Sequence, residues 1–197
     1  MEMGQVMSAV TLSVPEFVAW TALAEGRDRG SLASRLVDTE RFSQDAEYSE
    51  LGRLLLGARV SELDSAIVND LAKALTVLQE AQDCLLLYRA GSKSVKGYLF
   101  AAEGQVTWIE VTETGFEVRG GDADVIVTIF DSLLEGLRYD DVVFVKSETL
   151  SSEDVGLAWS SGSSRTLREN EWSDAGDLDV SDVSEAMRSF VRQTTES

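Results

Sequence analysis

Hydrophobic residues recur every three or four positions between Leu63 and Leu78, with polar residues between them. This spacing predicts an amphipathic helix that buries one face, and Ser61 with Asp64 forms a weak capping box at its start. The pattern then changes to a short, unbroken apolar run from Cys84 to Tyr88. Such a run is typical of a strand that is covered on both faces.

Three further segments after this run alternate apolar and polar residues with a period of two: residues 95–101, 106–111 and 116–119. A strand with one covered face requires this alternation. Turn signals separate the segments, for example Glu103-Gly104, and a last short strand is expected at residues 142–145. We therefore predict an α+β fold in which an antiparallel β-meander of about four to five strands packs against helices.

Other apolar patterns predict helices before and after the meander. Ser13 and Glu16 form a capping box at the start of an N-terminal helix, in which Trp20 is expected in the core. Residues 125–137 carry an apolar stripe so wide that it predicts burial against the sheet and against something further, such as a second subunit. A last helix, within residues 180–197, is expected to pack on the core or on a partner.

The composition changes after residue 146. Residues 147–179 are rich in Ser, Gly, Asp and Glu, and the run Ser-Ser-Gly-Ser-Ser at 160–164 predicts a flexible linker. The aspartates near residue 177 lack the spacing and the turn glycine of an EF-hand loop, so a solvated acidic segment is favoured over a calcium site. We therefore predict a core domain of residues 1–146, an acidic Ser/Gly-rich segment of residues 147–179 and a C-terminal helix in residues 180–197.

Charge narrows the classes of partner. The chain has 197 residues, with 35 Asp and Glu against 17 Lys and Arg, so its formal net charge is -18. Such a surface repels phosphate backbones and anionic lipids, which argues against binding nucleic acid or inserting into membranes. Residues 1–14 do not resemble a secretory signal, and no apolar run has the length of a bilayer. We expect a cytoplasmic protein, translated from Met1 or Met7.

The residue types available for catalysis are few. The chain has no histidine, which removes the commonest general base and metal ligand. Its single cysteine, Cys84, lies in the predicted buried strand, so an internal disulfide and a multi-cysteine zinc site are excluded. Paired carboxylates remain as a route to catalysis, but no spacing points to them. We expect no enzyme activity, no metal and no cofactor.

Two stretches carry a resemblance to a known family. The first is the segment 10–14 that leads into the helix with Trp20, and the second runs from Leu75 through the hairpins to Leu137. Together they resemble the EspG family, the cytoplasmic chaperones of actinobacterial type VII secretion. Members of that family are usually longer and have two similar α+β lobes, so this chain looks like a shortened, single-lobe relative, or one of which two copies pair.

The resemblance implies a chaperone or adaptor that binds the hydrophobic tip of a helical secretion substrate of the PE–PPE or WXG100 kind. Exposed aromatic residues would be the anchors of such a surface, and the candidates are Trp108, Phe116, Phe144, Trp159 and Trp172. For the three tryptophans, packing in the core is the alternative. The alternative function is an immunity or antitoxin protein that masks a basic toxin with an acidic face, formed by Glu169, Glu171, Asp174 and Asp177.

Overall fold

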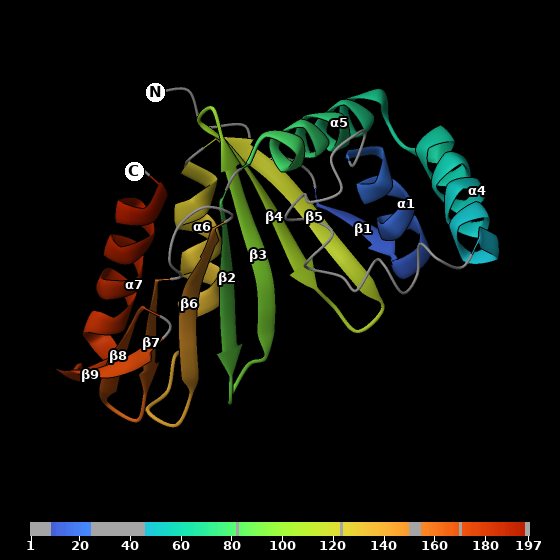
Figure 1. The fold of residues 1–197 in the computed structure, drawn as a ribbon. Coiled ribbons are helices and arrows are strands. Elements are labelled where there is room, and N and C mark those ends of the chain that lie inside the picture. The colour runs from blue at the N-terminus through green and yellow to red at the C-terminus, as the bar shows by residue number, and fades with distance from the viewer. Residues whose placement is uncertain are drawn as a thin grey trace.

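The computed structural model describes residues 9–24, 46–81, 83–122, 124–149, 155–169 and 171–195. Within these ranges the chain forms five helices and one nine-stranded antiparallel sheet (Figure 1), so the predicted α+β class is confirmed and the sheet is larger than predicted. The helices are α1 (Val14–Ala24), α4 (Ala46–Glu62), α5 (Ser65–Glu80), α6 (Asp124–Leu134) and α7 (Val180–Thr195). The strands are β1 (Val10–Ser13), β2 (Asp83–Ala90), β3 (Val95–Ala102), β4 (Gln105–Val111), β5 (Gly115–Asp122), β6 (Val142–Thr149), β7 (Gly156–Ser160), β8 (Ser163–Arg168) and β9 (Glu171–Asp177).

The sheet contains two consecutive four-stranded meanders, β2 to β5 and β6 to β9, each followed by a helix. The strand order is β1-β5-β4-β3-β2-β6-β7-β8-β9. Helix α6 carries the chain from β5 back to the middle of the sheet, where β6 pairs with β2 (Figure 1). The register of this pair runs from Asp83 opposite Thr149 to Ala90 opposite Val142, which joins the two meanders into one sheet.

Helices cover both faces of the sheet, but over different strands. The first face is the side that carries Leu12, Phe100 and Val118, and α1 and α5 pack on it over β1, β3, β4 and β5. Helix α4 packs against α1. The second face carries Leu87 and Val145, and its core includes residues of α6 and α7. The described residues therefore form two hydrophobic cores, one on each side of the sheet.

Side chains at the starts of two helices satisfy free backbone groups. The Ser13 N–H and hydroxyl both donate to Glu16 Oε2, at 2.7 and 2.6 Å, which forms the Glu16 half of the capping box predicted before α1. Helix α5 differs from the prediction. Asp64 alone caps it and accepts a backbone N–H at 2.8 Å, because α4 continues to Glu62 and the Ser61 hydroxyl donates to the Ala58 carbonyl there.

Residues 160–164, predicted to be a flexible linker, instead form the hairpin between β7 and β8. Ser161 and Gly162 have φ values of 51° and 81°, as a two-residue hairpin turn of type I′ requires. Trp159 and Leu167 in the flanking strands are only 1% and 4% exposed, and their burial stabilises strands that the serine-rich composition disguises. The linker prediction is wrong, and the described part of 147–179 belongs to the same sheet as the preceding strands.

A buried ion pair fixes the end of α6 to the sheet. Arg89 of β2 and Asp141, just before β6, are 1% and 0% exposed, and Arg89 Nη2 lies 2.8 Å from Asp141 Oδ2. The guanidinium also donates to oxygens at the end of α6 and in the β2–β3 turn: Leu133 O, Glu135 O, Gly136 O and Ser92 Oγ. Burial raises the pKa of Asp141, but hydrogen bonds from Ser92, Arg138 and Arg89 outweigh this effect and hold the pKa well below its ordinary 3.8.

Candidate protein-binding site

One half of the first face has no described helix over it. Figure 1 shows α1, α4 and α5 gathered beside β1, β4 and β5, away from β7, β8 and β9. Because side chains alternate along each strand, the cross-strand partners Leu86 and Lys146 share the first face, as do Phe144 and Ala158. The uncovered half therefore presents an ordered row of side chains from five neighbouring strands.

These side chains surround a hollow of about 570 Å³, which we call the open hollow. Its lining residues come from β2, β6, β7, β8 and β9: Leu86, Phe144, Lys146, Ala158, Arg165, Leu167 and Trp172. The register explains how they meet, since Ala158 lies opposite Arg165 and Leu167 lies opposite Trp172. A broad concave apolar surface on the outside of a small protein is typical of a binding site.

Trp172 is the most prominent apolar group of the open hollow, with 43% of its surface exposed. Its indole lies across Gly156, where an added Cβ would come within 3.1 Å of Trp172 Cη2. Phe144 is half-buried, and its ring packs against that of Tyr88 with 5.1 Å between the centroids. Both aromatic rings are thus held in place by neighbours while part of each surface remains accessible, which suits them to anchor a partner.

Two cations are part of this surface. Lys146 and Arg165 line the open hollow, although the chain has only 17 Lys and Arg against 35 Asp and Glu. The Arg165 side chain is exposed, and Asp174 is its cross-strand neighbour. The open hollow thus includes two cations on an otherwise acidic protein, with the Asp174 carboxylate next to one of them. It favours a partner that carries carboxylates beside its apolar residues.

The structure places the five predicted anchor residues in two groups. Trp108, Phe116 and Trp159 are 2%, 8% and 1% exposed, so their rings belong to the cores. The Phe116 ring stacks on that of Phe17 in α1, with 3.9 Å between the centroids, and Trp159 Nε1 donates to Leu178 O at 2.7 Å. Only Phe144 and Trp172 come together, at the open hollow.

Sequence reasoning missed five of the residues that line the open hollow: Leu86, Lys146, Ala158, Arg165 and Leu167. Leu86 was expected in a fully covered strand, and the other four lie in or next to a segment that was not expected to form strands. Alternation along β8 was the available signal, because Arg165 and Leu167 are two positions apart and therefore share a face. The pairing of β8 with β7 was needed to place that face beside Phe144.

The described residues offer little for other kinds of site. Among them, no group of three or more His, Cys, Asp or Glu side chains is placed to hold a metal ion. Cys84 is 1% exposed, which shields its thiol from substrates. None of the described helices has the length and apolar character needed to cross a membrane.

No protein-family model matches this chain, and no curated protein matches its sequence.

Proposed function

We propose that this protein binds a helical segment of another polypeptide in the open hollow and acts as a chaperone or adaptor for it. The observation that carries this proposal is the division of the first face. One half is covered by the chain's own helices, and the other half exposes Phe144 and Trp172 in a concave apolar surface. Apolar surface of this kind is normally covered by a partner.

The covered half of the first face indicates which partner structure would fit. There α5 lies over β3, β4 and β5 and buries Leu71, Ala74, Val77 and Leu78, the residues of its apolar stripe. The strands that line the open hollow continue the same sheet beyond β2. An amphipathic helix from a partner would extend the helical layer over β6 to β9, as layered α+β domains do within one chain.

Charge adds to the description of this partner. Carboxylates beside the apolar stripe of the helix would lie near Lys146 and Arg165, which line the open hollow. A second copy of this chain fits less well, because each copy carries a net charge of -18 and the two would repel. With the resemblance to the EspG chaperones, we propose that the partner is a helical type VII secretion substrate in the cytoplasm.

The proposal is tested by capturing partners from the native host and reconstituting the pair from purified proteins. We expect Trp172→Ser and Phe144→Ser each to weaken the affinity by about tenfold or more, because each removes a large apolar contact. Leu54→Ser is the matched control, since Leu54 is 65% exposed on α4 and lies outside the open hollow. That control variant should bind as the wild type does.

Salt distinguishes this proposal from an immunity protein that masks a basic toxin. Apolar contacts persist as the ionic strength rises, whereas an interface of exposed charges weakens. We therefore expect the reconstituted complex to survive about 1 M salt, where the Debye length is roughly 3 Å. A complex that dissociates in salt and is unaffected by Trp172→Ser would contradict the proposal. It would favour as the contact the acidic face formed by Glu169, Glu171, Asp174 and Asp177.

A further inference from the structure

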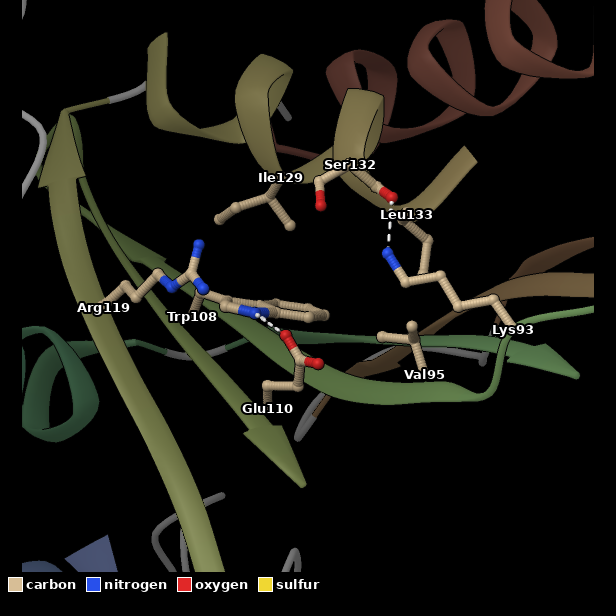
Figure 2. A pocket seen from close by; sticks show the side chains of 8 residues that line it. All are labelled: Lys93, Val95, Trp108, Glu110, Arg119, Ile129, Ser132 and Leu133. Atoms are coloured by element: carbon tan, nitrogen blue, oxygen red, sulfur yellow. Dashed lines mark hydrogen bonds between the residues drawn. The ribbon is translucent and has the colours of Figure 1, made fainter. Parts of the chain in front are cut away.

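A second pocket lies on the second face, on the other side of the sheet from the open hollow. It has a volume of about 180 Å³ and opens between α6 and strands β3, β4 and β5 (Figure 2). Its lining residues are Lys93, Val95, Trp108, Glu110, Arg119, Ile129, Ser132 and Leu133. Sites for drug-sized ligands occupy about 300–1,000 Å³. This pocket is smaller, so it suits a molecule of a few non-hydrogen atoms.

The floor of the pocket is the indole of Trp108, which is 2% exposed. The ring lies flat across Gly97, where an added Cβ would come within 2.1 Å of Trp108 Cη2. Figure 2 shows Ile129 on the helix side of this ring and Val95 at its other end. A glycine beneath the ring therefore gives the pocket a rigid aromatic floor.

Polar groups of both charges stand around this floor (Figure 2). Lys93 Nζ donates to the Ser132 carbonyl at 3.0 Å, and Trp108 Nε1 donates to Glu110 Oε2 at 3.4 Å. Arg119 Nε donates to Glu117 Oε1 at 2.6 Å, and Arg119 Nη2 pairs with the same oxygen. These bonds hold the side chains in position around the pocket.

Part of the hydrogen-bonding capacity of these groups is unused. The Ser132 hydroxyl makes no hydrogen bond within the described part of the chain, and Figure 2 shows it directed toward the space above the indole. Arg119 Nη1 also has no partner among the described residues, and the Lys93 ammonium has donors beyond its one bond to them. On the other side, Glu110 offers its second carboxylate oxygen as an acceptor.

We propose that this pocket binds a small zwitterion, a free amino acid with a small side chain. Its carboxylate would accept hydrogen bonds from Arg119, the Ser132 hydroxyl and Lys93, its ammonium would donate to Glu110, and its side chain would lie on the Trp108 indole. Charge-assisted hydrogen bonds of this kind are the strong ones in proteins. The site is independent of the open hollow, because the two lie on opposite faces of the sheet.

The mixed charge of the pocket favours a zwitterion over a simple ion. A bare anion would meet the Glu110 carboxylate and the carbonyl end of α6, which carries partial negative charge. A bare cation would meet Lys93 and Arg119. Only a ligand with both charges avoids repulsion on each side. A peptide keeps just one charged group at either terminus, so a free amino acid fits better than a chain terminus.

Nuclear magnetic resonance titration of the full chain with L-alanine tests the proposal. The readout is the indole N–H resonance of Trp108, identified by its loss in Trp108→Phe, or by sequential assignment if that variant does not fold. We expect a saturable shift of this resonance. N-acetylalanine lacks the ammonium and alaninamide lacks the carboxylate, so each should bind about tenfold or more weakly than L-alanine.

Variants assign the two charges. Glu110→Gln should weaken the binding of L-alanine by about tenfold and leave the binding of N-acetylalanine unchanged. Arg119→Gln should weaken the binding of both. Ser132→Ala gives a second, milder test of the carboxylate side. Lys96→Gln is the control, because Lys96 lies on the same hairpin as Lys93 but near Tyr98 on the first face. The proposal is overturned if L-alanine gives no saturable shift, if the three probes bind equally, or if Lys96→Gln weakens binding as much as Arg119→Gln.

Discussion

The contacts of the buried ion pair between Arg89 and Asp141 allow a prediction of the free energy of unfolding of its variants. Replacing Asp141 by asparagine keeps the shape of the side chain but removes the charge that faces the Arg89 guanidinium at 2.8 Å. Arg89 would then be a buried cation without a carboxylate. Removing one partner of a buried pair costs about 3–5 kcal/mol of unfolding free energy, and we expect Asp141→Asn to lose an amount in this range.

Arg89→Met should cost at least as much. This substitution leaves Asp141 as a buried charge without its cationic partner. It also removes the donor to three backbone carbonyls at the end of α6. Of these bonds only the one to Leu133 O is fully buried, and an unsatisfied buried acceptor adds about 1–3 kcal/mol. The double variant Arg89→Met/Asp141→Asn leaves no unpaired charge, so its loss should be smaller than the sum of the two single losses.

The pH dependence follows from the lowered pKa of Asp141. Because its folded-state pKa lies below its unfolded value near 3.8, the carboxylate contributes stability above pH 3.8 and loses it as the pH falls toward the folded-state pKa. The difference in unfolding free energy between wild type and Asp141→Asn should therefore shrink as the pH falls below about 4. The comparison of two variants cancels the titration of the other carboxylates.

Urea unfolding of the wild type and the three variants, monitored by tryptophan fluorescence and circular dichroism, measures these free energies. Two results would refute the reasoning. One is a loss below about 1 kcal/mol for each single variant, the range of an exposed pair. The other is a difference between wild type and Asp141→Asn that is constant or grows as the pH falls.

Two smaller changes test the local geometry, both by urea unfolding. Gly97→Ala should lower the free energy of unfolding by about 1–3 kcal/mol, because the new methyl group overlaps the Trp108 ring. The control is Gly57→Ala in α4, where nothing lies within 4 Å of the added Cβ, and it should raise the free energy of unfolding by about 0.5–1 kcal/mol. Equal effects of the two substitutions would contradict the packing of Trp108 on Gly97. Asp64→Ala should cost about 1 kcal/mol through the lost cap of α5, and a loss as large in Ser61→Ala would instead support the capping box predicted from the sequence.

The first meander was predictable because its residues alternate or repeat with clear periods. The stripe of α5 and the alternation in β3, β4 and β5 are both strong local signals. The second meander was not, apart from β6. In β9 every residue is exposed, so no apolar alternation marks it, and in β7 and β8 serines and glycines separate the few buried residues. Pairing with neighbouring strands, rather than local pattern, makes these segments strands.

The candidate site was predictable only in part, for a related reason. An exposed tryptophan and a buried one look alike in a sequence, and only the register separates Trp172 from Trp159. Outside the site, Arg89 was missed because an arginine at the end of an apolar run carries no sign of a distant partner. Asp141 lies in a turn, where a solvated aspartate is the usual interpretation. Both failures concern contacts that form between segments far apart in the chain.

The two faces of the second meander depend on each other. Behind the open hollow, Val145 and Trp159 are buried with Val183 and Met187 of α7, and Trp159 Nε1 is bonded to Leu178 O at 2.7 Å. The strands that present Phe144 and Trp172 are thus fixed from behind before any partner arrives. A preformed surface loses little conformational entropy on binding, so more of the contact free energy remains as affinity. The packing of α7 on one face therefore makes the other face suitable for holding a partner helix.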